Sequence, residues 1–214
     1  IAGMSSSFAG NKKLMTVNAA KVIAERAVVE SVIGLKVRSS ETVEDMIAKE
    51  VTVDAKTAAR IKGIEYTDIV YDPSKDIAQV EASIKLGKVN NIVGKNIDFG
   101  GRTISRYGFA TSTPAMAGPL QALRAAELDA YKQLAKTIVG FEIDSETSVK
   151  DYLLESDEVR AKMMAAIYGA DLVDYRWDEQ GDAYVKMRLR FGEVEDILNQ
   201  KINYEDEVIE VEGV

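Results

Sequence analysis

The feature that most constrains the fold of this chain is an internal repeat. When the sequence is laid over itself at an offset of 106 residues, apolar and glycine positions coincide over about seventy residues, and Gly34 meets Gly140. After one deletion the offset becomes 105, and Val80 meets Val185. We therefore expect two similar domains in tandem, the first over residues 1–95 and the second, with an acidic C-terminal tail, over residues 96–214. Other coinciding pairs are Ala19/Ala125, Ala20/Ala126, Ala24/Ala130, Gly63/Gly169, Asp72/Asp178 and Gly87/Gly192.

Each copy begins with an alanine-rich helix. Apolar residues recur at helical spacing over residues 17–33, and the counterpart carries such a stripe from Leu123 to Ile138. Gly34 and Gly140 are expected to end these helices in the left-handed conformation. A second helix is expected after Ser156, whose side chain can cap it, with Val159, Met163, Ala166 and Ile167 on its apolar side.

Each copy ends in two strands with alternating polarity. In the later copy Val185, Met187, Leu189 and Phe191 alternate with Lys186, Arg188 and Arg190. One side of such a hairpin is apolar and needs helices against it. A further strand over residues 104–110 is expected before the first helix, and Gly100-Gly101 can turn an additional hairpin. The prediction is an α+β fold in which each domain has the order β-α-α-β-β, an antiparallel sheet with helices packed on one side.

The composition removes several kinds of catalytic chemistry. With no cysteine and no histidine, thiol nucleophiles, disulfides, Cys/His zinc sites and imidazole acids or bases are excluded. The residues shared by the copies are mostly Ala, Val, Ile and Gly, which serve packing and turns. We therefore predict that the protein is not an enzyme. We expect no catalytic, cofactor-binding or metal-ligating residue and no cofactor.

Carboxylates are the remaining candidates for chemistry. One group of carboxylates follows the first helix of each copy. Paired carboxylates can catalyse hydrolysis by acid–base chemistry. The favoured interpretation is that they cap the short helical turn that follows. A carboxylate-only calcium or magnesium site near Asp178 is a second hypothesis, but its spacing matches no calcium loop. Asp72 and Asp178 are expected in turns. The first groups are Glu41, Glu44 and Asp45, and Glu146 and Asp151; the second is Asp178, Glu179 and Asp182.

Charge is unevenly distributed along the chain. The net charge of −8 argues against nucleic-acid binding. Residues 195–214 carry a net −6, whereas the connector over residues 88–106 carries +3. Two solvated segments are the favoured interpretation. The alternative is that the acidic tail docks on the basic connector of the same or another copy, its VIEVEGV end adding a strand. Lys186, Arg188 and Arg190 are expected to pair with acids across strands.

Two segments carry a family resemblance. They are QALRAAELDAYKQLAKTIVGFEIDSETSVKDYL and VNAAKVIAERAVVESVIGLKVRSSETVEDMI, each an alanine-rich helix, a glycine and a short S-E-T segment. Over 70 to 90 residues of each half, the pattern resembles the LPP-twenty family of bacterial outer-membrane lipoproteins, related to the flagellar proteins FlgP and the N-terminal region of FlgT. The resemblance implies an α+β domain, an envelope location and structural roles, in several members around the flagellar motor.

The leading functional hypothesis is a non-enzymatic structural or assembly protein of the cell envelope, in the periplasm or outer membrane, acting as a homo-oligomer. Flagellar or other envelope proteins are candidate partners. The alternative is an envelope ligand-binding module that uses the groove between the domains, and a third hypothesis is a carboxylate hydrolase using Asp151 or Glu146. The chain opens at Ile1, so we expect an upstream segment with a secretory signal or lipid anchor, the only membrane attachment expected.

Overall fold

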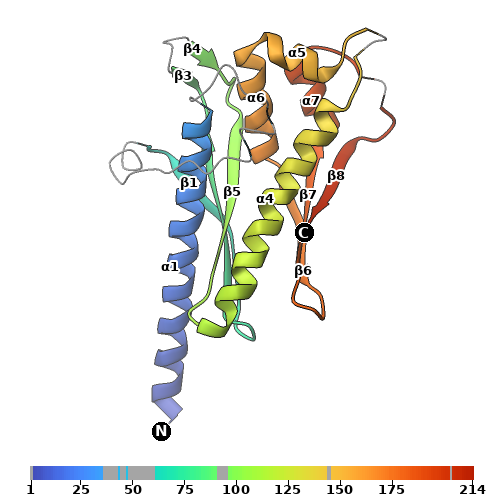
Figure 1. The fold of residues 1–214 in the computed structure, drawn as a ribbon. Coiled ribbons are helices and arrows are strands. Elements are labelled where there is room, and N and C mark those ends of the chain that lie inside the picture. The colour runs from blue at the N-terminus through green and yellow to red at the C-terminus, as the bar shows by residue number, and fades with distance from the viewer. Residues whose placement is uncertain are drawn as a thin grey trace.

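The computed structural model describes residues 2–35, 43, 47, 61–90, 96–143, 146–202 and 204–214 (Figure 1). Over these residues the fold is mixed α+β, with five α-helices and two three-stranded antiparallel sheets. A two-stranded hairpin and one short 3-10 turn complete the described elements.

The first sheet has the strand order β1-β2-β5 and is covered by α1. The helix lies over β2 and β5 and contacts β1 less, which leaves β1 largely exposed at the edge. A hairpin formed by β3 and β4 joins β2 to β5. The elements are α1 (Ala2–Gly34), β1 (Ile64–Asp72), β2 (Ile77–Lys85), β3 (Lys88–Asn90), β4 (Asn96–Asp98) and β5 (Thr103–Ala110).

The second sheet has the order β6-β7-β8 and is covered by α4, which lies over β7 and β8. Helix α7 joins β7 to β8, in the place where the first sheet has its hairpin. The elements are α4 (Ala117–Val139), α5 (Val149–Glu155), α6 (Asp157–Tyr168), β6 (Asp171–Trp177), β7 (Ala183–Arg190), α7 (Phe191–Leu198) and β8 (Val208–Gly213).

A glycine on the third strand of each sheet lets the covering helix lie directly on the strand backbone. Gly108 pairs with Val80, and Gly213 pairs with Val185. A Cβ atom at Gly108 would lie 2.2 Å from the carbonyl oxygen of Ala20. At Gly213 it would lie 2.1 Å from the carbonyl oxygen of Ala126. No side chain fits at either position, so both helices depend on glycine for this close approach.

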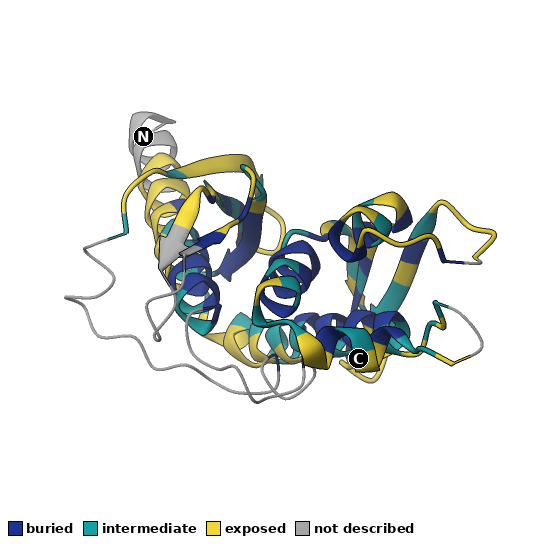
Figure 2. Cartoon of the chain, turned by 90° about the horizontal axis from the view of Figure 1, so that it is seen from above, coloured by how far each residue is buried: buried dark blue, intermediate teal, exposed yellow. Residues whose placement is uncertain are grey.

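The core is continuous through both sheets. Buried residues follow the inner sides of α1 and α4 and the strands beneath them (Figure 2). The predicted alternation on β7 is confirmed, because Val185, Met187 and Leu189 are buried while Arg188 and Arg190 are exposed. Ser156 caps α6 as predicted, since its side chain accepts a hydrogen bond from the Val159 N–H at 3.3 Å.

The predicted order β-α-α-β-β is wrong for the strand over residues 104–110. This strand is β5, and it pairs with β2 along its whole length instead of joining the second sheet. Two features direct β5 back onto the first sheet. They are the close contact of Gly108 with α1 and the β3–β4 hairpin that precedes β5. A division after residue 95 therefore separates β5 from the sheet that it completes.

Several helix predictions need correction. α1 begins at Ala2, about fifteen residues before the predicted start, because its first turns lack proline and extend a helix already held by packing. Gly140 follows α4 as predicted, and Gly169 follows α6, but neither glycine is left-handed. A Cβ atom at Gly169 would lie 2.8 Å from the Thr103 carbonyl oxygen, so this glycine serves close packing on β5.

Two further predictions concern the connecting segments. α7 was not expected, because Phe191 was assigned to the preceding strand. The glycine pair Gly100-Gly101 turns the chain from β4 into β5 with positive φ angles at both residues, whereas the additional hairpin is β3–β4. The second helix expected in the first copy falls on residues 36–60, most of which lie outside the described residues.

Candidate functional site

The two sheets meet where β5 passes between α1, α4 and β6 (Figure 1). The Phe109 ring meets the Tyr175 ring edge-on, with centroids 5.0 Å apart. The Tyr107 hydroxyl accepts a hydrogen bond from the Leu172 N–H at 3.2 Å. Residues of β5 therefore face both layers, which explains why nearly the whole strand is buried.

Trp177 makes a second set of contacts across this junction. Its indole N–H donates a hydrogen bond to the Pro119 carbonyl oxygen at 3.0 Å. The Lys75 ammonium, from the turn between β1 and β2, lies 5.7 Å from the centre of the indole ring. The end of β6 is thus fixed both to the start of α4 and to the first sheet.

A buried arginine lies at the centre of the junction. The Arg106 guanidinium donates to the Ser31 hydroxyl at 2.7 Å and lies 4.9 Å from the centre of the Tyr131 ring and 5.1 Å from that of Tyr168. Its Nε atom is 3.6 Å from a carboxylate oxygen of Glu127. This cluster joins α1, β5, α4 and α6, so one buried charge links elements that cover both sheets.

Glu127 is the acid of this cluster, and it is 1% exposed. Burial raises the pKa of its carboxyl, while nearby Arg106 and Arg124 oppose that rise. Among the described residues, no donor makes a hydrogen bond to its Oε1 atom. The Arg106 Nε atom and the Tyr131 hydroxyl are also buried without a hydrogen-bond partner at normal distance, and both act as donors that lower the pKa of Glu127, so the three groups are partners within one buried cluster.

Glu127 also lines a groove between α1, β5 and α4. The groove has a volume of about 330 Å³. Its apolar part is formed by Ile23 of α1, Phe109 of β5 and Leu120 of α4, and Arg124 stands in its wall beside Glu127. This is the largely apolar hollow at the junction of the two sheets, with polar groups at one part of its wall.

A second polar cluster surrounds Asp76, which follows β1 in a turn with a positive φ angle. Its carboxylate accepts hydrogen bonds from the Tyr71, Ser112 and Thr113 hydroxyls at 2.9, 2.7 and 2.9 Å, and Lys12 pairs with it at 3.5 Å. Burial alone would raise the pKa of Asp76, but the hydrogen bonds outweigh it and hold the pKa below its usual value. This carboxylate is fully engaged and holds α1, the first turn and the segment after β5 together.

The candidate carboxylates of the sequence have structural contacts. Asp151 faces the start of α5, where the Ser148 hydroxyl accepts its N–H and donates to its carboxylate. Glu146 is exposed just before that helix. Asp72 accepts the Ser74 N–H, and Asp178 accepts the N–H groups of Gln180 and Asp182, so both are turn residues as predicted. Glu41, Glu44 and Asp45 lie outside the described residues.

The C-terminal segment adds a strand, as one hypothesis expected, but to its own sheet. β8 pairs with β7, and Glu210 pairs with Arg188 at 2.7 Å and Lys186 at 3.5 Å. Glu212 pairs with Arg176 at 2.7 Å. The expected cross-strand pairing is therefore confirmed for Lys186 and Arg188, while Arg190 is exposed.

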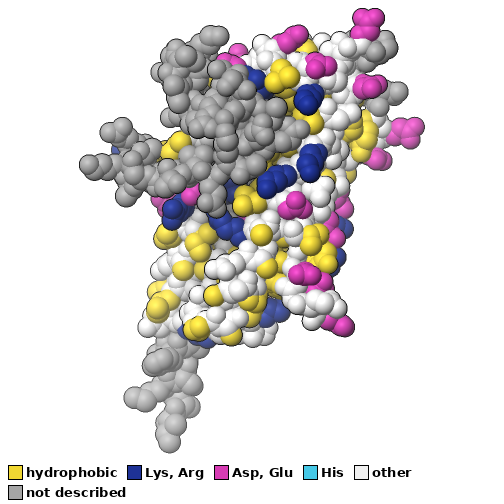
Figure 3. All heavy atoms as spheres, viewed as in Figure 1, with side chains coloured by type: hydrophobic (Ala, Val, Ile, Leu, Met, Phe, Trp, Pro, Cys, Tyr) yellow, Lys and Arg dark blue, Asp and Glu magenta, His cyan; other side chains and the backbone are white. Residues whose placement is uncertain are grey.

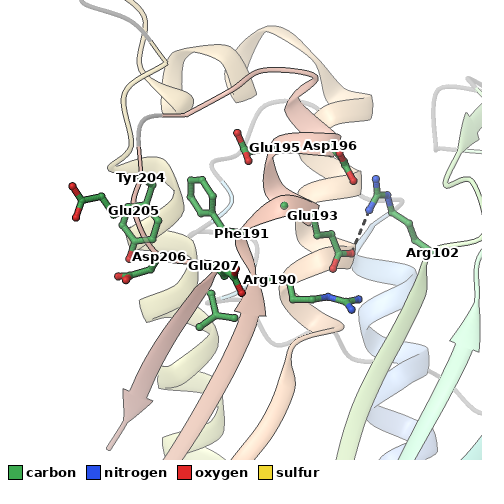
Figure 4. A pocket seen from close by; sticks show the side chains of 12 residues that line it. Arg102, Arg190, Phe191, Glu193, Glu195, Asp196, Tyr204, Glu205, Asp206 and Glu207 are labelled. Atoms are coloured by element: carbon green, nitrogen blue, oxygen red, sulfur yellow. Dashed lines mark hydrogen bonds and ion pairs between the residues drawn. The ribbon is translucent and has the colours of Figure 1, made fainter.

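The connector cations have other partners. Arg106 is buried in the junction, and Arg102 pairs at 3.3 Å with Glu193 on α7, just before the acidic tail. Figure 4 shows this ion pair at one side of an open hollow of about 810 Å³, with acidic side chains spread around its wall and the Phe191 and Tyr204 rings stacked beside it. Within the described residues, no group of three or more acids lies close enough together to hold a metal ion.

Asp76, Arg106 and Glu127 were not predicted from the sequence to be important positions. Arg106 lies in the basic connector, yet it shares one side of its strand with Ile104, Gly108 and Ala110, at the two-residue spacing of a buried strand side. Glu127 stands four residues after Leu123 and three before Ala130, in the apolar stripe of α4. An ionisable residue in such a pattern is the signal that would have marked both.

Comparisons with protein-family models, with curated proteins and with solved structures find no match for this chain. None of the described helices has the length and apolar character needed to cross a bilayer.

Proposed function

We propose that this chain is a non-enzymatic structural protein of the bacterial cell envelope, made of two copies of one α+β unit, that acts by self-association. The tandem arrangement is supported by the matched Val80–Gly108 and Val185–Gly213 pairs and by the two glycine contacts with the covering helices. Where the structure describes them, neither sheet brings the candidate carboxylates together in a cavity, and the chain has no cysteine or histidine.

The observation that carries self-association is a difference between the first strands of the two sheets. Leu172 and Tyr175 of β6 are contacted by Tyr107 and Phe109 of the preceding half. Their counterparts in the repeat, Tyr66 and Ile69 of β1, are 36% and 48% exposed. Within the described residues these two side chains stay partly exposed, so a second copy is a fitting cover.

The exposed surface of β1 continues onto α1. The Lys13 ammonium lies 6.0 Å from the Tyr71 ring, and that of Lys21 lies 5.6 Å from the Tyr66 ring. Leu14, the residue after Lys13 on α1, is 58% exposed. On the face seen in Figure 3, hydrophobic side chains are also exposed over the lower parts of α1 and α4. We call Leu14, Tyr66 and Ile69 the α1–β1 surface.

Contact through side chains fits β1 better than addition of another strand. β1 has an irregularity between Thr67 and Val70, and Asp68 has a φ angle of 50°. Such bulges interrupt the row of free backbone groups that a new strand would need. Exposed apolar groups flanked by lysines are instead suited to packing against the same surface of a second copy, an arrangement typical of two-fold dimers.

The test is light scattering after gel filtration, over a range of protein concentrations. The parent chain is expected to associate, and Ile69→Lys to shift the equilibrium toward monomer because it places a charge in the apolar contact. Val173→Lys, at an exposed position on β6, is the matched control and should leave association unchanged. A parent chain that stays monomeric at the highest concentration would overturn the proposal.

The envelope location rests on the resemblance to lipoproteins and is tested in cells. The complete gene product, expressed in a bacterium, is expected in the membrane or periplasmic fraction. Its recovery with cytoplasmic proteins would contradict this part of the proposal, while leaving self-association to be judged by light scattering.

A further inference from the structure

We infer that self-association stops at a pair of copies, because the outer side of the second half is a charged surface on which a further copy does not stack. This inference rests on the proposed association through the α1–β1 surface, and it specifies that each copy meets the same surface of the other. The residues that set the limit are Asp129 on α4 and Glu212 on β8, which we call the α4–β8 surface.

The junction inside one chain shows what a surface that receives another half looks like. Tyr107 and Phe109 of β5 are only 5% and 8% exposed, because residues of β6 lie against them. Ile23 of α1 lines the groove that also has Leu120 of α4 in its wall. The receiving side of the first half is therefore made of aromatic and aliphatic side chains, whose burial is favourable.

The corresponding positions of the second half carry acids. β8 forms an edge of the second sheet beside α4, as β5 forms an edge of the first sheet beside α1 (Figure 1). The two glycine contacts fix the correspondence at an offset of 106 residues in the helices and 105 in the third strands. Ile23 then corresponds to Asp129, and Tyr107 corresponds to Glu212. The surface that would receive a further copy thus has carboxylates where the junction has an isoleucine and a tyrosine.

Both carboxylates already have partners in their own half. Arg176 donates two hydrogen bonds to Glu212, at 2.7 and 3.2 Å, and the Glu212 side chain stays 35% exposed to water. Asp129 accepts a hydrogen bond from the Val214 N–H at 3.2 Å. A copy that stacked here would remove water from both charges while facing them with apolar side chains. Burial of a charge without new hydrogen bonds is unfavourable, so stacking is opposed.

The α1–β1 surface has the opposite character. Leu14, Tyr66 and Ile69 are exposed apolar or aromatic side chains. The flanking Lys13 and Lys21 have long side chains that can keep their ammonium groups in water at the rim of a contact. Two copies can therefore bury these apolar residues against each other, and the pair then carries an α4–β8 surface on each copy. A polar outer side of this kind is what ends an array of repeats.

The first test needs no variant. Sedimentation velocity and light scattering of the parent chain, over a range of concentrations, should show a monomer–dimer equilibrium that levels off at the dimer mass. A ladder of trimers and larger species would overturn the inference, because it would show that the α1–β1 surface stacks on Asp129 and Glu212 of the next copy. A parent chain that stays monomeric would instead overturn the proposed association, and the inference with it.

The repeat supplies the variant that should remove the limit. Asp129→Ile with Glu212→Tyr gives the second half the residues that the first half has at these positions. Head-to-tail stacking then makes one contact for every copy, whereas a pair makes one for every two copies. The mean mass should therefore rise to at least about twice that of the parent dimer.

Glu158→Ile with Glu179→Tyr is the matched control. It adds the same two residues and removes two acids at exposed positions, on α6 and in the turn after β6, and it should stay dimeric. Circular dichroism should report a folded chain for both double variants. A folded Asp129→Ile, Glu212→Tyr chain that also stays dimeric would overturn the inference.

A triple variant separates stacking from aggregation. Ile69→Lys, added to Asp129→Ile and Glu212→Tyr, should abolish the larger species, because stacking needs the α1–β1 surface of the next copy. Larger species that persist in the triple variant would overturn the inference, since the copies would then be joined without that surface.

Discussion

The two halves of the molecule pair their strands in the same way but connect them differently. β2 reaches β5 through the β3–β4 hairpin, whereas β7 reaches β8 through α7. In both sheets a helix nevertheless lies on the backbone of a third-strand glycine. The contact between the helix and the third strand is therefore retained in both halves, although the segment before the third strand differs. The polar clusters are not repeated: the Asp76 cluster belongs to the first half, and the Arg106 cluster lies at the junction.

The glycine contacts are the most sensitive point of the comparison. Gly108→Ala is expected to lower the free energy of unfolding by about 4 kcal/mol, because the new methyl group collides with backbone atoms of α1 that cannot move independently. Gly213→Ala should cost about as much, because its Cβ atom would lie equally close to backbone atoms of α4. Urea unfolding followed by circular dichroism measures both.

Gly118→Ala is the control for this pair, since nothing lies within 4 Å of a Cβ atom there. It stands in the first turn of α4, where alanine is the better helix former, so stability should be unchanged or rise by up to about 1 kcal/mol. Parent-like stability in Gly108→Ala would mean that α1 does not lie on β5 as described.

The junction arginine has a hydrophobic counterpart in the second sheet. In the first sheet Arg106 pairs with Ala82. At the matching position of the second sheet Val211 pairs with Met187, so Val211 is the counterpart of Arg106. Arg106→Met is expected to cost about 3 kcal/mol, because it leaves the buried Glu127 carboxylate without its counter-charge. Adding Glu127→Leu should recover much of that loss, because the double variant replaces the ion pair with apolar packing.

A double-mutant cycle in urea separates these effects. Two losses that simply add would contradict the coupling of Arg106 and Glu127 across the junction. The result would also bear on the comparison itself, since a stable double variant would show that the junction needs shape more than charge.

The smallest expected effect concerns the turn between the first two strands of each sheet. Asp76 is buried among donors, whereas Asp182, its counterpart in the repeat, is exposed. Asp76→Asn is expected to cost about 2 kcal/mol at neutral pH through the lost charge-assisted hydrogen bonds, and Asp182→Asn less than about 0.5 kcal/mol.

The pH dependence of this effect follows from the lowered pKa of Asp76. A folded-state pKa below the ordinary value of 3.8 means that the carboxylate stabilises the fold above about pH 4 and that this contribution is lost as the pH falls below it. The stability difference between the parent and Asp76→Asn chains should therefore shrink in acid. A difference that stays constant down to pH 2 would contradict the ionic role of Asp76.

The sequence predicted the elements held by local pattern and missed those set by distant contacts. The strand alternation on β7 and the cap at Ser156 are fixed by neighbouring residues, and both are confirmed. The sheet that β5 joins depends on Gly108 meeting Ala20 far along the chain, which no local pattern reveals. For the same reason the Arg106–Glu127 pair and the groove beside it were not predicted as a site, although an inter-domain groove was considered.

The position of Trp177 gives the molecule a natural optical reporter. It is the only tryptophan in the chain, and its indole ring is held between the start of α4 and the ammonium of Lys75. Its ultraviolet emission should therefore change when the two halves separate, even while each keeps its secondary structure. Fluorescence and far-ultraviolet circular dichroism recorded on one sample would distinguish separation of the halves from loss of their folds, without any attached label.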